Sequence, residues 1–310
     1  MNRAQVRAWR GMTAVQKSRV GDALLNATIR DGAIIAPDGY DVSHRLKLEI
    51  RTTEAQRKHA KDRSTMGLFA DENGGFVFSL FISCSTVAER FPTLTQSDMA
   101  RLMFIGTYTG YEDGRLRYDN GTPLLRTSLE KLVGLSRARF SEFYNRLVTE
   151  DILREEDGEI DINPTVFQRG GSEVAGTEDY QRTRLYRRTV RDLYEAYGKG
   201  RDVKQLAIVY AVIPFLHFNT NIVCYNPQEY NAEKLKPMTL DKLAALLHYS
   251  DTQKLKIAMS SVMLGGRPVF GFVEDVNDKR KRRVIVNPRV VFAGNADGLR
   301  QVRGICALFN

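Results

Sequence analysis

Two stretches of the chain, 124 residues apart, end in the same way. Residues 160–171 read IDINPTVFQRGG, and residues 284–295 read VIVNPRVVFAGN. Each combines the end of an aliphatic strand with Asn-Pro, an aromatic residue and then a glycine. A repeated ending predicts a repeated folding unit, and two copies are too few for a solenoid. The sequence therefore favours the duplication of a small folded unit.

The first unit is expected between residues 95 and 172. It opens with a helix of amphipathic spacing and a short strand between two turns. Two helical patterns follow, with Thr127 and Ser136 as candidate N-caps and a break at Gly134 between them. A hairpin with its turn at Asp157-Gly158 closes the unit. Helix, strand, helix-turn-helix and hairpin in this order are typical of a winged helix.

The second unit, expected between residues 201 and 295, repeats this order. It begins with an apolar helix that contains Pro214, and two helical patterns follow, capped by Thr239 and by Ser250 or Asp251. Another hairpin ends at the second Asn-Pro. The predicted fold is α+β and mainly helical: two winged helix-turn-helix domains joined by a helical linker, with a small N-terminal α/β extension.

Three further segments complete the predicted organisation. Residues 1–94 form the extension, with a loose basic arm and β-strands, and residues 296–310 form a tail that packs back on a domain or pairs two chains. Residues 173–200 form a basic linker helix after a Gly/Ser-rich start. The arginines of this linker face solvent, contact phosphate or brace the two domains: Arg182, Arg184, Arg187, Arg188 and Arg191. The last four are candidate DNA contacts.

The composition is that of a globular protein with an anionic partner. The chain has 310 residues and a formal net charge of +9, and residues 201–310 carry 16 Lys/Arg against 9 Asp/Glu. A basic balance most often indicates nucleic acid. No apolar run approaches the ~18–20 residues of a membrane span, and the first residues lack the apolar stretch of a secretory signal. We therefore expect a cytoplasmic protein without membrane contact.

Sequence motifs for catalysis or metal binding are not apparent. The three cysteines are far apart, and the four histidines form neither HxH nor HExxH. The sequence has no GxxxxGK[ST] phosphate loop and no GxSxG nucleophile elbow. Its acidic turns lack the alternating ligands of a calcium loop. We accordingly expect a binding protein rather than an enzyme, without a cofactor or a metal.

A helix-turn-helix unit places the start of its second helix in the major groove of DNA. There, arginine pairs with guanine and asparagine with adenine. For the first unit, the candidate DNA contacts are Arg137, Arg139, Ser141, Asn145 and Arg146. For the second unit, they are Thr252, Gln253, Lys254 and Lys256.

The two hairpin tips carry opposite charge. The second reads DKRKRR, and its cations are candidate phosphate contacts that supply affinity: Lys279, Arg280, Lys281, Arg282 and Arg283. The first reads REEDGE, and a like-charge contact at ~4 Å costs on the order of 4 kcal/mol at an effective dielectric near ~20. This acidic hairpin is expected to point away from DNA, to meet the basic linker or to touch another protomer. The second unit then anchors the protein, and the first reads DNA weakly or binds protein.

Residues 97–170 and the stretch VIVNPRVVFAGN resemble winged-helix proteins of Gram-positive phages and plasmids. Many of those proteins carry a similar ending after the wing, with Asn-Pro, an aromatic residue and a glycine, and the second stretch resembles plasmid replication-maintenance proteins of this kind. A looser match covers TTEAQRKHAKDR followed by GGFVFSLFI. The resemblance implies a mobile-element protein that binds DNA in replication initiation, copy control or gene regulation. It carries over no catalytic residues.

Three functions agree with these patterns. The first is replication initiation, in which the chain binds an origin on a plasmid or phage. The second is transcription regulation with the same DNA contacts, and the third is protein docking without DNA binding. The expected partner is double-stranded DNA, with self-association or a host replication or transcription protein as a further contact.

Overall fold

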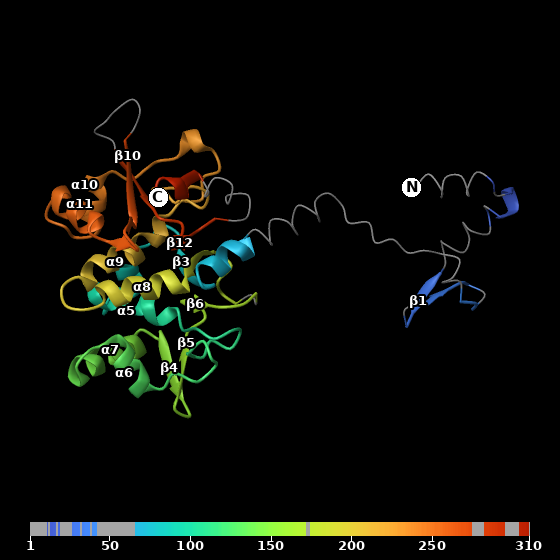
Figure 1. Ribbon diagram of the computed structural model, residues 1–310, viewed down its shortest axis with the longest axis horizontal. Coiled ribbons are helices and arrows are strands. Elements are labelled where there is room, and N and C mark those ends of the chain that lie inside the picture. Colours follow the sequence, from blue (N-terminus) through green and yellow to red (C-terminus); the bar gives the residue numbers. More distant parts are fainter. Residues whose placement is uncertain are drawn as a thin grey trace. The chain divides into compact units, whose positions relative to one another are not determined.

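The computed structural model describes residues 11, 13–16, 18, 27–31, 33–37, 39–41, 66–171, 174–274, 282–294 and 304–309. The chain divides into two compact units, Met1–Lys58 and His59–Asn310 (Figure 1). In the first unit, β1 (Thr28–Arg30) and β2 (Ala33–Ile35) form an antiparallel hairpin. Asp31 has a φ of 49° in the turn, the left-handed conformation that tight hairpin turns require.

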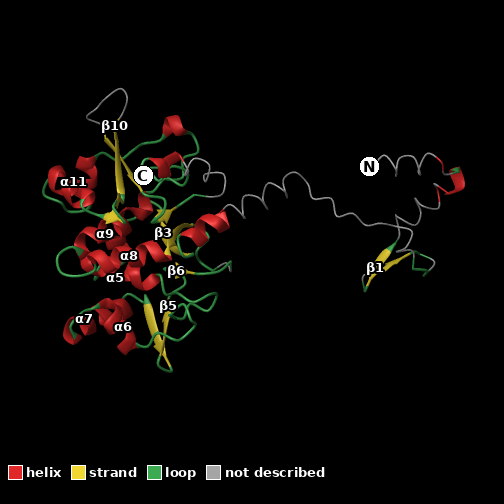
Figure 2. Ribbon diagram, in the orientation of Figure 1, coloured by secondary structure: helices red, strands yellow, loops and turns green. Residues whose placement is uncertain are grey.

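The larger unit contains an antiparallel sheet whose neighbouring strands are remote in sequence, and Figure 2 labels two of them, β3 and β6. Its strand order is β12-β7-β3-β6, and Phe78 of β3 pairs with Arg184 near the middle. Burial alternates along most of β7, which is the two-residue period of a strand. The strands are β3 (Phe76–Ile82), β6 (Phe167–Gln168), β7 (Tyr180–Tyr186) and β12 (Val291–Phe292).

Three helices pack against one another and contribute many residues to the main apolar cluster: α5 (Gln96–Gly106), α8 (Arg187–Tyr197) and α9 (Val203–Val212). α5 begins with a capping box between Thr95 and Asp98. α9 is almost entirely buried, and the chain tightens at Pro214 into the 3₁₀ turn Ile213–Phe215. These helices therefore form the structural centre from which the outer elements project.

Two parts of this unit share an outer arrangement of two helices and a β-hairpin, and we call them the first half (residues 66–171) and the second half (residues 174–294). The first half contains α4 (Val87–Arg90), α6 (Arg126–Val133), α7 (Arg137–Thr149), β4 (Leu153–Glu156) and β5 (Glu159–Ile162). The second contains the 3₁₀ turn Ala232–Lys234, α10 (Leu240–Leu246), α11 (Thr252–Ser260), β8 (Met263–Leu264), β9 (Arg267–Pro268), β10 (Phe270–Glu274) and β11 (Arg282–Val286).

Most of the predicted helix boundaries are confirmed. Ser136, Thr239 and Asp251 are the N-cap residues of α7, α10 and α11. Gly134 ends α6 with a φ of 71°, which glycine adopts without a steric penalty. The prediction for Thr127 is wrong, because the N-cap of α6 is Leu125, two residues earlier, and this threonine lies inside the helix.

Matching hydrogen bonds connect a short bridged segment of each half, at Leu116 and Val223, to the hairpin of that half. The amide of Leu116 donates to the carbonyl of Ile160 at 2.8 Å, and the amide of Val223 donates to that of Val284 at 2.9 Å. The acceptors are 124 residues apart, the same interval that separates the two Asn-Pro endings. The backbone therefore repeats its pairing as well as its sequence.

The two Asn-Pro endings make the same local turn. The side-chain oxygen of Asn163 accepts a hydrogen bond from the amide two residues later at 3.0 Å, and Asn287 does the same at 3.0 Å. This Asx arrangement turns the chain out of the hairpin. In both halves it leads directly into an edge strand of the large sheet, β6 or β12.

The expectation of two winged helix-turn-helix domains joined by a helical linker is wrong. Residues 180–186 were expected to be helical but form β7, which pairs along its full length with β3 from the predicted N-terminal extension. α5 packs on α9, and one apolar cluster contains residues of both halves. Because the sheet and the core are shared, the halves are parts of one α+β unit with several antiparallel sheets.

Candidate nucleic-acid interface

The start of α7 presents two arginines to solvent. The turn at Gly134 separates α6 from α7, and Arg137 and Arg139 are exposed at the first turn of α7. Within the described part of the chain, neither side chain has an ion-pair or hydrogen-bond partner. The opposite side of the helix is buried through Phe140, Phe143, Tyr144 and Leu147. Two free guanidinium groups beside the unpaired backbone amides of a helix start form a surface suited to an anion.

Farther along α7, Arg146 is held internally. Its Nε donates to the carboxylate of Asp98 at 3.0 Å, and this carboxylate is only 2% exposed. The pair attaches α7 to the beginning of α5, so Arg146 acts as an anchor for the helix. Of the other two candidates on α7, Asn145 is exposed and Ser141 is half-buried.

The acidic hairpin of the first half is partly neutralised by its own neighbours. Arg115 forms ion pairs with Glu159 and, at 3.7 Å, with Asp161. The hydroxyl of Tyr144 donates to Glu155 at 2.9 Å, and burial together with this carboxylate raises the pKa of Tyr144. These contacts attach the hairpin to its own half and do not involve the arginines of residues 182–191.

The start of α11 carries fewer unpaired charged side chains than the start of α7 does. Asp251 caps the helix by accepting from the amide of Lys254 at 2.7 Å, and this hydrogen bond lowers the pKa of Asp251. The Lys254 ammonium lies 3.6 Å from the same carboxylate. Gln253 is exposed, Thr252 is half-buried, and Lys256 lies over the ring of Phe272 at 5.9 Å.

Two arginines of the predicted linker are fixed inside the structure. Arg184 donates to the carbonyl of Gly294 and lies over the ring of Phe78 at 5.2 Å. Arg187 is 6% exposed, pairs with Asp119 and donates to the carbonyl of Thr107 at 2.7 Å. Of the three roles expected for these arginines, an internal brace agrees with this geometry.

Arg191 joins the same brace, whereas Arg188 faces solvent. Arg191 pairs with Asp119 at 2.7 Å and lies over the ring of Tyr108 at 3.9 Å. Partial burial raises the pKa of Asp119, but the hydrogen bonds and charges of Arg191 and Arg187 more than offset it, so the pKa is lowered. Arg188 is exposed and lies 3.5 Å from the carbonyl of Glu72.

A basic segment that runs from the end of α8 into the first turn of α9, which sequence reasoning missed, lies near both halves. Lys199, Arg201 and Lys204 are exposed, and their side chains have no partner among the residues described. We call these three residues the basic turn. In Figure 1 this yellow turn lies between α7 and α11 along the left side of the view. The signal in the sequence was GKGRDVK, where three cations surround a single Asp202.

Two tyrosines of α8 hold the basic turn in place. The Tyr194 hydroxyl donates to the carbonyl of Val133 at the end of α6, at 2.9 Å. The Tyr197 hydroxyl donates to the carbonyl of Ser261, just after α11, at 3.0 Å, and accepts from the amide of Met263 at 2.9 Å. The last turn of α8 thus contacts the outer helices of both halves, and the basic turn follows it directly.

The strongest cation cluster of the sequence lies mostly outside the described residues. This applies to Lys279, Arg280 and Lys281. Arg282 and Arg283 begin β11, where they pair with Glu274 and Val273 of β10. The backbone pairing agrees with the predicted hairpin up to this point.

Among the described residues, no group of three His, Cys, Asp or Glu side chains could hold a metal ion. In the same part of the chain, no helix combines the length and the apolar character needed to span a membrane. Comparison of this chain with protein-family models, with curated protein sequences and with solved structures gave no match.

Proposed function

We propose that this chain binds duplex DNA through the start of α7, the basic turn and the start of α11. The observation that carries the proposal is the exposed, unpartnered pair Arg137 and Arg139 at the first turn of a helix whose other side is fixed in the core. A B-form major groove is wide enough for one helix, and arginine can read guanine there with two hydrogen bonds. A rigid helix gives those bonds a defined direction.

The basic turn supplies contacts of a different kind. Lysine and arginine side chains on a short turn suit phosphate oxygens, which fix the position of a protein on DNA without reading its sequence. Neutralising phosphates releases counterions, so these contacts make affinity depend on salt. The turn is tied to the outer helices of both halves through Tyr194 and Tyr197, and it is therefore well placed to support both.

The two halves contribute unequally in this proposal. The first offers free guanidinium groups for base recognition, whereas α11 offers Gln253 and a lysine already close to its cap. Arg184, Arg187 and Arg191 are excluded from the DNA surface because their guanidinium groups have internal partners. Lys279 to Arg283 continue as proposed phosphate contacts on sequence grounds.

The biological role that we propose is replication initiation on a plasmid or phage, with transcription regulation as the alternative. Both roles use the same DNA contacts, so the location of the preferred site discriminates between them. A site within a replication origin supports the first role, and a site that overlaps a promoter supports the second.

A second candidate function is protein docking by the acidic hairpin of the first half. Glu156 and Asp157 are exposed at its tip, and like charge disfavours contact with phosphate. A basic surface on a host replication or transcription protein would suit this hairpin. Such docking is compatible with DNA binding elsewhere on the unit.

The test is a selection of bound sequences from random duplexes, followed by affinity measurements at several salt concentrations. Wild-type protein should bind duplex at ~50 mM salt, with an affinity that falls steeply as salt rises. Arg137→Ala with Arg139→Ala should change the selected sequence, whereas Lys234→Ala, an exposed cation on the 3₁₀ turn of the second half, should not. Absence of bound duplex at ~50 mM salt would refute DNA binding and leave protein docking.

Neutralising the basic turn should give the opposite pattern from changes in α7. Lys199→Gln, Arg201→Gln and Lys204→Gln together should weaken binding to all sequences and reduce the salt slope by about one per lost contact. The selected sequence should be unchanged. An unaltered salt slope would remove the basic turn from the interface while leaving α7 in place.

A further inference from the structure

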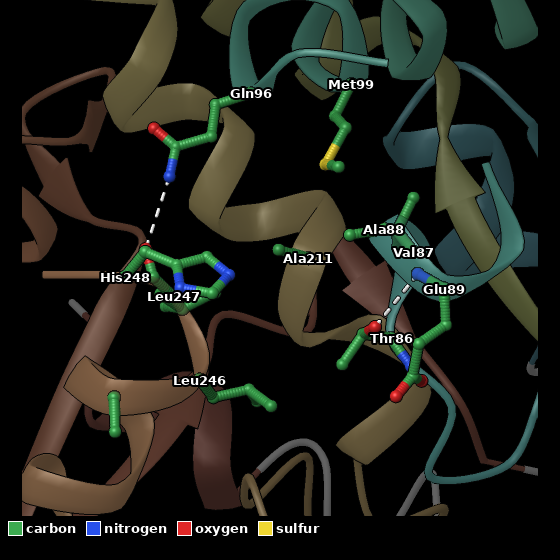
Figure 3. Close-up of a pocket in the computed structure, with 11 residues that line it drawn as sticks. Thr86, Val87, Ala88, Glu89, Gln96, Met99, Ala211, Leu246, Leu247 and His248 are labelled. Carbon is green, nitrogen blue, oxygen red and sulfur yellow. Dashed lines mark hydrogen bonds between the residues drawn. The ribbon is translucent and has the colours of Figure 1, made fainter. Parts of the chain in front are cut away.

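A cavity of about 450 Å³ lies beside the end of α10, between elements of the two halves (Figure 3). Residues of α4, α5, α9 and α10 surround it. The apolar part of its wall consists of Val87, Ala88, Met99, Ala211, Ala245, Leu246 and Leu247. Thr86, Glu89, Gln96 and His248 add polar groups, and Gln96 donates to the carbonyl of Leu247 at 3.2 Å. Its size is within the range of small-molecule sites, and its wall is mainly apolar with few polar groups.

Beside the end of α6, two stacked aromatic rings, one from α5 and one from α8, occupy a comparable position. The rings of Phe104 and Tyr194 lie 3.9 Å apart between centroids, with 8° between their planes. The Tyr194 hydroxyl donates to the carbonyl of Val133 at 2.9 Å. Both rings are buried, and burial raises the pKa of Tyr194 to about 12, so the hydroxyl keeps its proton at neutral pH.

Matching backbone features identify which residue of α9 corresponds to Phe104. Thr109 and Leu216 form equivalent bridges just after α5 and α9, and these positions differ by 107 residues. The N-caps of the two helices, Thr95 and Asp202, differ by the same interval. Ala211 therefore corresponds to Phe104, and it lies in the wall of the cavity.

The other two partners are identified in the same way. α4 and α8 each end five residues before the next N-cap, so Val87 corresponds to Tyr194. α6 and α10 are each followed within two residues by a residue with positive φ, 71° at Gly134 and 57° at His248. The residues directly before these two, Val133 and Leu247, therefore correspond to each other. The carbonyl of Leu247 therefore corresponds to the carbonyl that accepts from Tyr194.

The cavity thus arises because the smaller side chains of Ala211 and Val87 stand where the corresponding positions carry the stacked rings of Phe104 and Tyr194. The corresponding carbonyl is retained, and Gln96 donates to it. A carbonyl oxygen has two lone pairs and can accept a second hydrogen bond. Figure 3 shows Met99 and Gln96 extending from α5 at this cavity, and a thioether makes favourable contacts with aromatic rings.

We infer that this cavity binds a small planar aromatic molecule with a hydroxyl group, a phenol. The ring would lie against Ala211 and Val87, in the space that corresponds to the one filled by the Phe104–Tyr194 pair. The hydroxyl would donate to the carbonyl of Leu247, as the Tyr194 hydroxyl donates to the carbonyl of Val133. This inference does not rest on DNA binding.

The test uses the full chain and 4-methylphenol, followed by calorimetry and by NMR of labelled methionine methyl groups. Wild-type protein should show saturable binding, with a shift of the Met99 methyl resonance. The Met66 methyl, which packs in a separate apolar cluster, should not move. Toluene has the same ring without the hydroxyl and should bind more weakly, because it leaves the carbonyl without its second donor.

A matched pair of variants checks the location. Ala211→Phe restores the first-half residue and should abolish binding, whereas Ala196→Phe changes an exposed position of α8 and should leave binding unchanged. Absence of saturable binding to wild-type protein, or binding that persists in folded Ala211→Phe, would overturn the inference. If Ala211→Phe does not fold, a Met99 resonance that stays in place as 4-methylphenol is added to wild type overturns it equally.

Discussion

At the scale of single residues, Arg184, Arg187 and Arg191 stabilise the fold through internal partners, although the sequence predicted them as DNA contacts. The spacing of the linker arginines gave no indication that Asp119, 68 residues before Arg187, would approach them. Arg187 is nearly inaccessible, and a buried guanidinium without a partner would be strongly destabilising. Asp119 and the carbonyl of Thr107 are the partners that this guanidinium group finds within the fold. Long-range pairing of this kind has no local sequence signal.

We predict that Arg187→Ala lowers the free energy of unfolding by about 2–3 kcal/mol, because the carbonyl of Thr107 loses a buried hydrogen bond and the packed side chain is lost. Arg188→Ala, the exposed neighbour, should change it by less than about 0.5 kcal/mol. Urea unfolding of the two variants measures the difference. Equal effects would contradict the internal brace.

Asp119 should make the stability sensitive to acid. Its pKa is lowered in the folded protein, so its contribution is present above the unfolded pKa of about 3.9 and is lost as pH falls through the folded value. The carboxylate is largely exposed, and solvent screening keeps the effect modest. Asp119→Asn should therefore flatten the decline in melting temperature below about pH 4 relative to wild type. An unchanged pH profile would contradict this assignment.

At the scale of secondary structure, locally encoded elements were predictable and the large sheet was not. α7, α11, both hairpins and the Gly134 break follow from caps, turns and helical spacing. β7 escaped prediction because Tyr186, Val190, Leu193 and Tyr197 continue a helical spacing across the point where β7 becomes α8. The strand is stabilised by pairing with β3, about 100 residues earlier, and a local pattern contains no information about that partner.

The candidate site divides in the same way. Arg137 and Arg139 could be located from sequence because a helix start is a local feature. The basic turn could not, since its importance comes from the contacts of Tyr194 and Tyr197 with the two halves. The cavity beside the end of α10 could not be located from sequence either, because it is recognised only when the two halves are compared in three dimensions.

The turn between α6 and α7 should depend on the backbone of Gly134. A Cβ at this position would meet nothing within 4 Å, so Gly134→Ala introduces backbone strain without a steric clash. We expect a loss of about 1–2 kcal/mol in the free energy of unfolding. Gly171→Ala is the control, because that glycine also has open space and lacks a positive φ. If both substitutions had the same effect in urea unfolding, the turn would not need its left-handed residue.

At the scale of the whole molecule, the duplicated halves are merged through their shared elements. β3 and β7 pair with each other, and each also pairs with the edge strand that follows the Asn-Pro ending of its own half. α5 of the first half packs on α9 of the second. The two hairpins differ in charge, because the hairpin of the first half is acidic and that of the second is basic. One rigid unit can therefore present different chemistry at its two ends.

This merging predicts that the first half cannot fold alone. A fragment of residues 95–172 lacks β3, β7 and α9, and it would expose Leu102, Met103 and Ile105, all of which are fully buried in the complete unit. Such a loss of apolar burial removes about 1.5–3 kcal/mol per side chain, which exceeds what a small domain can spare. We expect this fragment to show an undispersed amide NMR spectrum, whereas residues 59–310 should show a dispersed one and unfold in a single transition. A dispersed, cooperatively melting spectrum from residues 95–172 would instead mean that the half is an autonomous domain and that the shared sheet is dispensable.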